Sequence, residues 1–178
     1  MLNFSINLKN FYRKQHNEKI KKNLKNLLLN DNHVLKSLSS RYVNNYNLKK
    51  LKKIIGKNSV RLIGMGGSIL GAQAIYNFLQ HKIKKKFFFI NNLETKHEAK
   101  ISKFANLIVS KSGNTLETIS NANILIKKKD KNIFITEKKN SYLFNLAQKL
   151  KAEIISHNNY IGGRYSVLSE VGMLPAEL

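Results

Sequence analysis

The sequence predicts an α/β protein in which helices flank a doubly wound parallel sheet and an N-terminal helical segment precedes it. Two observations carry this prediction: short runs of β-branched and aromatic residues recur from residue 60 onward, and stretches with helical spacing separate them. Strands joined by helices of crossover length form parallel sheets, because right-handed crossovers connect parallel neighbours. We therefore divide the chain into a helical lead-in, residues 1–56, and an α/β domain, residues 57–178.

The lead-in has apolar residues at three- and four-residue spacings between residues 4 and 55, which predicts two or three helices. Residues 30–33 interrupt this pattern. Gly56 follows the last apolar residue, at a position where glycine commonly ends a helix. We expect these helices to wrap the domain that follows, and none of their residues suggests chemistry.

Five strands are predicted in the second part of the chain, over residues 60–63, 87–90, 107–109, 133–136 and 153–156. In open parallel sheets, ligands bind outside the carboxyl ends of the strands. The loops that follow Ile63, Val109 and Thr136 are therefore the places where we expect chemistry.

Composition narrows the class of protein. The 178 residues are 42% hydrophobic and include no cysteine, so one substantial core can form, whereas disulfides and thiolate metal sites are excluded. No apolar run approaches the roughly 20 residues of a membrane span, and the N-terminus lacks a signal-peptide pattern. We expect a cytoplasmic protein without membrane contact.

The formal net charge of +22 is compatible with a nucleic-acid partner. However, Lys, Asn, Ile and Phe are all abundant whereas Arg, Pro and Trp are rare or absent, the bias that an AT-rich coding sequence produces. No metal-ligand spacing, RNA-binding aromatic signature or heptad array accompanies the charge. We expect compositional drift and no specific nucleic-acid partner, with a selected basic surface as the alternative.

The first candidate loop, GMGGSILG, spans residues 64–71 between the first predicted strand and a helix over residues 72–79. Its glycines let a ligand approach the backbone, and Ser68 is placed to cap the helix, whose free first-turn amides favour an anion. The glycines do not follow the G-x-G-x-x-G spacing of dinucleotide sites. The alternative is a tight turn that binds nothing.

The second candidate loop, SKSGNTLET, spans residues 110–118, again between a strand and a helix. A phosphate monoester needs several donors around its oxygens, and hydroxyls together with exposed helix amides supply them. We therefore predict Ser110, Ser112 and Thr115 as phosphate ligands. The alternative makes Thr115 an ordinary helix cap, with Glu117 favouring the positive helix end.

The third segment, IGGRYSVLS, spans residues 161–169 and is followed by EVGMLP. Arg164 stands directly after two glycines in a chain that otherwise prefers Lys, which indicates a site that requires a planar, permanently charged fork. A surface ion pair at the start of a helix near Ser166 is the alternative.

Together the three segments resemble, in order and spacing, blocks of the glucose-6-phosphate isomerase family, whose fold consists of two sugar isomerase (SIS) domains. The segment GGRYSVLSEVGMLP is the most diagnostic, since glycine-rich and Ser/Thr loops also occur in other SIS proteins. The resemblance covers about the last two thirds of the chain. It implies interconversion of glucose 6-phosphate and fructose 6-phosphate through an enediol, a step of glycolysis and gluconeogenesis, without metal or organic cofactor.

The resemblance also implies a role for each site residue. The sugar would be contacted by Gly67 and Ser68, the phosphate would be held by Ser110, Lys111, Ser112 and Thr115, and Arg164 would be catalytic beside the reacting carbons. Arg164 would stabilise the charge that develops on the enediolate oxygen. The full-length form is expected to be a homodimer.

The family's catalytic base lies on segments after the GGR block, and nothing in this sequence matches those segments. We therefore expect an N-terminal piece of a longer isomerase, truncated at the C-terminal end of its domain and inactive alone. The alternative function is a stand-alone SIS module that binds a sugar phosphate for regulation.

Overall fold

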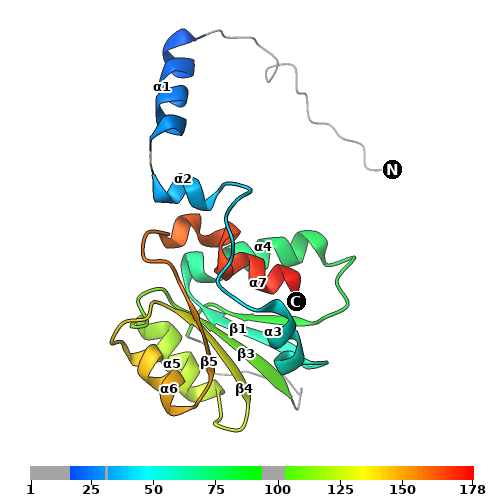
Figure 1. The fold of residues 1–178 in the computed structure, drawn as a ribbon. Helices are drawn as coiled ribbons and strands as arrows, with labels where there is room; N and C mark the ends of the chain where they lie inside the picture. Colours follow the sequence, from blue (N-terminus) through cyan, green and yellow to red (C-terminus); the bar gives the residue numbers. More distant parts are fainter. Residues whose placement is uncertain (1–16, 31, 94–102) are drawn as a thin grey trace.

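Five parallel strands form one sheet in the computed structural model, which describes residues 17–30, 32–93 and 103–178 (Figure 1). The strands are β1 (Ser59–Gly64), β2 (Phe87–Ile90), β3 (Phe104–Val109), β4 (Lys131–Thr136) and β5 (Glu153–Ser156). They lie in the order β2-β1-β3-β4-β5, and all neighbouring pairs are parallel. All five predicted strands are confirmed, although β1, β3 and β4 begin one to three residues earlier than predicted.

The strand order reverses at β1. The chain runs outward from β1 to β2, then returns across β1 to β3 and continues to β4 and β5. The last residues of the two strands at this reversal, Gly64 and Val109, are paired in register. The loops after β1 and β3 therefore leave the sheet side by side, at the switch point where doubly wound sheets bind ligands.

Helices cover both faces of the sheet and give three layers (Figure 1). The helices are α1 (Glu18–Leu29), α2 (His33–Ser37), α3 (Leu48–Ile55), α4 (Leu70–Leu79), α5 (Leu116–Leu125), α6 (Tyr142–Lys149) and α7 (Glu170–Glu177), with the 3-10 turns η2 (Gly66–Ser68) and η3 (Gly163–Leu168). Residues of α3, α4 and α7 pack against one face of the sheet, and residues of α5 and α6 pack against the other.

Alternate residues of each central strand supply the two cores. In β1, Leu62 joins the core under α3, α4 and α7, whereas Ile63 joins the core under α5 and α6, and both side chains are fully buried. In β4, Ile133 and Ile135 face the first core and Phe134 faces the second. A parallel strand covered on both faces reads as a continuous apolar run, which is the pattern that made these strands recognisable in the sequence.

The lead-in forms three helices within residues 17–56, in agreement with the predicted two or three, and residues 4–16 of that prediction lie outside the described residues. The expectation that they wrap the domain is wrong for α1, which has no buried residue and projects away from the sheet (Figure 1). It holds for α3, where Leu51 and Ile55 are 1% exposed. Gly56 caps α3 with φ +58°, and its N–H donates to Lys52 O at 2.8 Å. The division of the chain at residue 56 stays a prediction.

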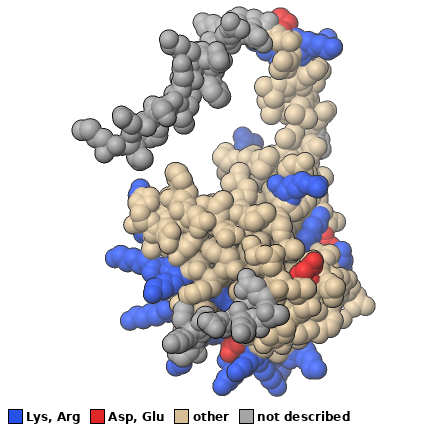
Figure 2. All heavy atoms as spheres, turned by 180° about the vertical axis from the view of Figure 1, so that it is seen from behind, with Lys and Arg blue, Asp and Glu red and all other residues tan. Residues whose placement is uncertain are grey.

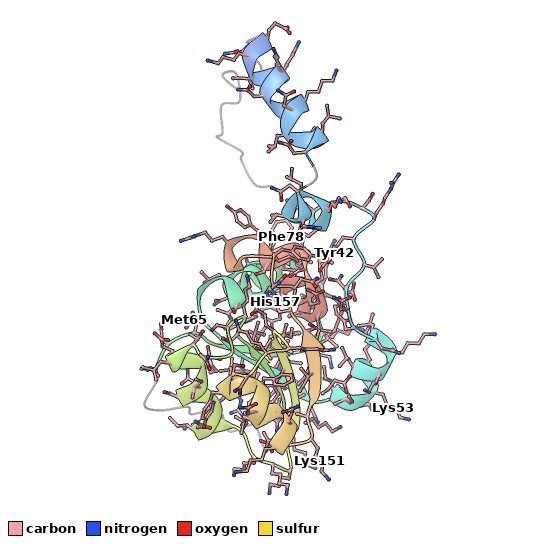
Figure 3. The ribbon with its side chains drawn as sticks, turned by 60° about the vertical axis from the view of Figure 1, so that its left-hand side comes forward. Tyr42, Lys53, Met65, Phe78, Lys151 and His157 are labelled. Carbon is pink, nitrogen blue, oxygen red and sulfur yellow. The ribbon has the colours of Figure 1, made fainter. Side chains whose placement is uncertain are left out.

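Lysines that precede the strands gather at the amino-terminal edge of the sheet, opposite to the loops of interest. Lys84–Lys86 lie directly before β2, Lys127–Lys129 lie one residue before β4, which itself begins with Lys131, and Lys151 lies two residues before β5. Figure 3 shows Lys53 and Lys151 at the end of the molecule away from His157, and Figure 2 shows the blue side chains concentrated on that lower part of one face. Among the described residues, no helix is both long and apolar enough to cross a membrane.

The contrast between α3 and α1 leads to a prediction for stability. Leu51→Ala leaves a cavity in the core under α3 and should lower the free energy of unfolding by about 2–4 kcal/mol. Leu28→Ala, in α1, removes a side chain that is 67% exposed and should change it by less than about 0.5 kcal/mol. Urea unfolding followed by circular dichroism measures both, and equal losses would contradict the assignment of α3 to the core.

Candidate functional site

The glycine-rich loop after β1 and the GGR segment meet through their backbones. A Cβ atom built on Gly67 of η2 would lie 2.2 Å from the carbonyl oxygen of Gly163, the first residue of η3. No side chain fits at that distance, so only glycine at position 67 allows the contact. Two segments about 95 residues apart are thereby joined at the carboxyl edge of the sheet.

Two further contacts fix η3 against its neighbours. The Ser166 hydroxyl is fully buried and donates to Gly163 O at 2.8 Å and to Gly67 O at 3.2 Å. Val167 packs between α4 and α7, because Cβ atoms built on Gly71 and Gly172 would lie 2.7 and 2.1 Å from it. The glycines in the first and third sequence segments therefore serve close packing as well as ligand access.

The loop after β3 turns sharply at Gly113, where φ is +69°. A Cβ atom there would lie 2.1 Å from Ser141 Oγ, so glycine is required by conformation and by space. The turn brings Ser110 Oγ to 3.0 Å from Thr115 Oγ1, and Ser112 Oγ accepts a hydrogen bond from Asn114 N at 3.2 Å. The three predicted phosphate ligands therefore lie on one short loop.

This loop also presents unpaired backbone donors. Thr115 is the N-cap of α5, but its hydroxyl bonds to Ser110 and does not cap the helix, in contrast to the alternative drawn from the sequence. Within the part of the chain that the structure describes, the N–H groups of Lys111, Ser112 and Thr115 have no acceptor. Hydroxyls, open amides and a helix N-terminus together form an arrangement that suits a phosphate group. We call residues 110–115 the anion loop.

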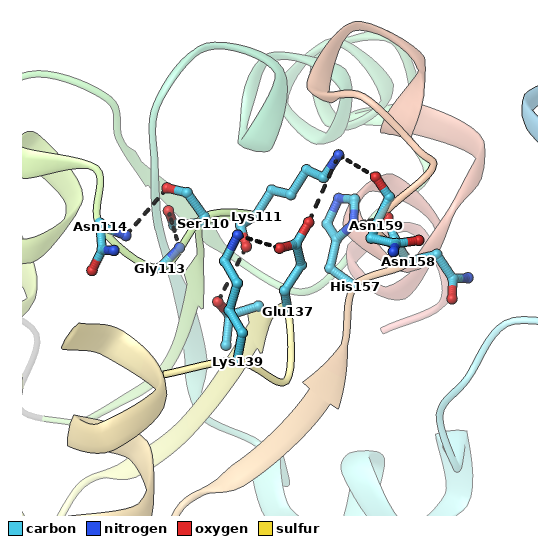
Figure 4. Close-up of polar contacts among 11 residues, drawn as sticks. Ser110, Lys111, Gly113, Asn114, Glu137, Lys139, His157, Asn158 and Asn159 are labelled. Atoms are coloured by element: carbon cyan, nitrogen blue, oxygen red, sulfur yellow. Dashed lines mark hydrogen bonds and ion pairs between the residues drawn. The ribbon is translucent and has the colours of Figure 1, made fainter. Parts of the chain in front are cut away.

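The Lys111 side chain extends away from the hydroxyls, toward the ends of β4 and β5 (Figure 4). Its ammonium donates to Asn159 O at 2.6 Å and lies 3.8 Å from Glu137 Oε1. Glu137 comes directly after β4, at a position that the sequence marked as a place for chemistry without naming a residue. One of its polar partners, Lys139, lies two residues away, whereas the other, Lys111, lies in the loop after β3, and no local pattern in the sequence signals that second contact.

Arg164 and Ser68 are both available to a ligand. Arg164 lies on η3, is exposed, and makes no hydrogen bond or ion pair with any residue that the structure describes, so the described residues give no support to the alternative of a surface ion pair. Ser68 does not cap α4 as expected, because η2 inserts a turn and places Ile69 at the N-cap. Likewise, the helix expected near Ser166 begins only at Glu170, after η3.

Two buried titratable groups lie behind the edge of the sheet. Glu170 Oε1 accepts from the Tyr42 hydroxyl at 2.9 Å and from Asn45 N at 3.3 Å, so this carboxylate anchors the chain before α3. Burial lowers the pKa of His157, against the opposing effect of the Asn158 carbonyl, and so favours a neutral ring.

No group of three or more His, Cys, Asp or Glu in the described ranges could hold a metal ion.

A family model described as phosphoglucose isomerase matches residues 8–178, which is nearly the whole chain. The chain belongs to this family. The match confirms the resemblance drawn from the three segments, and it extends further than predicted, because it includes most of the lead-in helices. Membership in the phosphoglucose isomerase family thus accounts for the shared order of the glycine-rich loop, the anion loop and the GGR segment.

Individual relatives agree with the family model. The chain is 37% identical over 142 residues to a glucose-6-phosphate isomerase of Methanocaldococcus jannaschii, an alignment that covers 72% of this chain and 35% of that protein. It is 32% identical over 158 residues to one of Borreliella afzelii, covering 78% of this chain and 29% of that protein. The chain therefore spans about a third of the length of these curated relatives.

Solved structures share the fold. A hypothetical protein of Thermus thermophilus superposes with a TM-score of 0.61 at 23% identity, over 73% of this chain and 34% of the other. An Escherichia coli protein in complex with a sugar phosphate gives the same TM-score of 0.61 at 19% identity, over 90% of this chain and 88% of the other. A tagatose-6-phosphate ketose/aldose isomerase of Escherichia coli has a TM-score of 0.52 at 15% identity, over 67% of this chain and 38% of the other. The SIS-like fold predicted from the sequence is confirmed.

Because Gly67 contacts the backbone of Gly163, a methyl group added at Gly67 should destabilise the fold more than one added at Gly162. Gly67→Ala forces η2 and η3 apart and should lower the free energy of unfolding by about 1–3 kcal/mol. Gly162→Ala is the control, since its Cβ would meet only the Tyr165 ring at 3.6 Å; the change should be less than about 1 kcal/mol. Denaturant unfolding measures both, and a tolerated Gly67→Ala would show that the two segments do not meet in this way.

Proposed function

We propose that this chain provides the first sugar-phosphate-binding unit of an aldose-ketose isomerase that interconverts glucose 6-phosphate and fructose 6-phosphate. The observation that carries the proposal is the anion loop, whose hydroxyls and open amides lie at the switch point beside the glycine-rich loop. The phosphoglucose isomerase family supports the isomerase class, and the E. coli protein that was solved with a sugar phosphate shares the fold.

In this proposal the phosphate is held by Ser110, Ser112 and Thr115 through their hydroxyls and by Lys111 through its backbone N–H. A phosphate dianion at the N-terminus of α5 also benefits from the positive end of the helix dipole. The sugar then extends toward η2, where Gly67 and the hydroxyl of Ser68 contact it. Because η2 and η3 touch, the reacting carbons would lie near Arg164.

Arg164 is the proposed catalytic residue on this chain. The reaction moves a proton between two neighbouring carbons through an enediol, and negative charge develops on an oxygen on the way. A fixed guanidinium stabilises that charge more than it stabilises the neutral sugar, and a difference of this kind lowers the barrier. No pairing with a described carboxylate competes for Arg164.

The carboxylate that moves the proton is proposed to lie outside this chain. Glu170 is buried and bonded to Tyr42, and Glu137 contacts both Lys111 and Lys139, so neither is free to accept a proton from a sugar. The alignments with this chain cover only 35% and 29% of two curated relatives. The isolated chain is therefore proposed to bind the sugar phosphate without turnover, and the complete enzyme to act as a homodimer.

Calorimetric titration of the isolated chain tests the proposal. Glucose 6-phosphate should bind and glucose should not. Ser110→Ala should weaken glucose 6-phosphate binding about tenfold, because a hydrogen bond to a charged group is lost. Ser40→Ala, at an exposed position in the lead-in, is the matched control and should leave the affinity unchanged.

Two results would contradict the proposal: equal binding of glucose and glucose 6-phosphate, or an unchanged affinity in the Ser110→Ala variant. Turnover of glucose 6-phosphate by the isolated chain would contradict the placement of the base elsewhere.

A further inference from the structure

One bond ties the anion loop to the segment that carries Arg164. Residues 157–162, which we call the connector, run from the end of β5 to η3. The Lys111 ammonium donates to the connector carbonyl of Asn159 at 2.6 Å (Figure 4). Arg164 follows five residues later, so the position of this carbonyl bears on where the guanidinium lies.

Glu137 is placed to control that bond. Its carboxylate lies 3.8 Å from the Lys111 ammonium through Oε1 and 2.5 Å from the Lys139 ammonium through Oε2. Its own N–H donates to Lys111 O at 3.1 Å, so backbone and side chain of Lys111 are both held from the same residue. The Glu137 side chain is only 13% exposed, which reduces screening of the pair by water.

Other contacts also hold the connector. The side-chain amide of Asn158 donates to the Tyr42 hydroxyl at 2.8 Å, and His157 N donates at 3.0 Å to the carbonyl of Thr136, the last residue of β4. Ile161 is fully buried. Among the described residues, Lys111 is the one anion-loop side chain that bonds to the connector.

We propose that Glu137 is a positioning residue: it fixes the Lys111 ammonium on the Asn159 carbonyl, so holds the connector against the anion loop, and thereby fixes the start of η3, where Arg164 lies. The inference rests on the proposed function for its ligand, but the tether itself is a property of the unliganded chain. It assigns the Lys111 side chain to the connector and leaves the phosphate to the loop's hydroxyls and backbone. The groups that set the affinity for phosphate therefore differ from the groups that position Arg164.

Hydrogen exchange of the unliganded chain tests the tether directly. In Glu137→Gln and Lys111→Met, amides of residues 157–163 should exchange at least about fivefold faster than in the unmodified chain. Lys111→Arg keeps a long cationic donor, so its amides at residues 157–163 should exchange as slowly as those of the unmodified chain. Glu18→Gln, in the projecting helix α1, makes the same change in net charge as Glu137→Gln and should have no effect. Unchanged exchange in Glu137→Gln, with or without an effect of Lys111→Met, would overturn the proposal.

Ligand binding gives a readout that a purely structural role would not move. In Glu137→Gln the affinity for glucose 6-phosphate, divided by the affinity for inorganic phosphate, should fall about threefold or more. A displaced Arg164 weakens contacts with the sugar, which inorganic phosphate lacks. With Arg164→Ala already present, Glu137→Gln should not lower the ratio further. An equal change in both affinities would overturn the proposal, since the Lys111 ammonium would then act on the phosphate.

The proposed function and the role of Glu137 can be refuted independently of each other. If the unmodified chain shows no preference for glucose 6-phosphate over inorganic phosphate, the proposed function fails, while the exchange rates still decide whether Glu137 holds the connector.

Discussion

The candidate site depends on one close approach of backbones, the contact between Gly67 and Gly163. A methyl group at Gly67 would overlap the carbonyl of Gly163, so the absence of a side chain sets how near η3 can lie to the loop after β1. The Ser166 hydroxyl then bonds carbonyls from both segments. Arg164 lies on η3 and reaches the carboxyl edge of the sheet through this contact, since its own side chain has no hydrogen bond or ion pair with the described residues.

The sheet supplies the second half of the arrangement. Because Gly64 and Val109 end paired strands, the glycine-rich loop and the anion loop start next to each other. Among the described residues, the hydroxyls of the anion loop bond only within the loop, and the N–H groups of Lys111, Ser112 and Thr115 have no acceptor, so these donors are open to water or to a ligand. The positive charge of the lysine runs gathers at the opposite edge of the sheet. Recognition of an anion at the site therefore relies on directed donors more than on net charge.

Local patterns were sufficient to predict the sheet, the loops and the family. All five strands could be predicted because both faces of the sheet are covered, so that each strand contains a short apolar run rich in β-branched or aromatic residues. The N-cap role of Ser68 could not be judged from sequence, because the η2 turn depends on packing against η3. The exposed position of α1 was missed because an amphipathic pattern shows that a face is apolar without showing what covers it. Glu137 and Asn159 escaped notice because the residue that links them, Lys111, lies far away in the sequence, in the loop after β3.

The central claim is that three sequence segments form a single sugar-phosphate site. Mapping amide chemical shifts by nuclear magnetic resonance, with glucose 6-phosphate and inorganic phosphate as ligands, tests it most directly. The account predicts that inorganic phosphate shifts amides of residues 110–118, and that glucose 6-phosphate also shifts those of residues 64–71 and 161–169. Shifts by glucose 6-phosphate that stay within residues 110–118, or that spread over the lysine-rich edge, would contradict it.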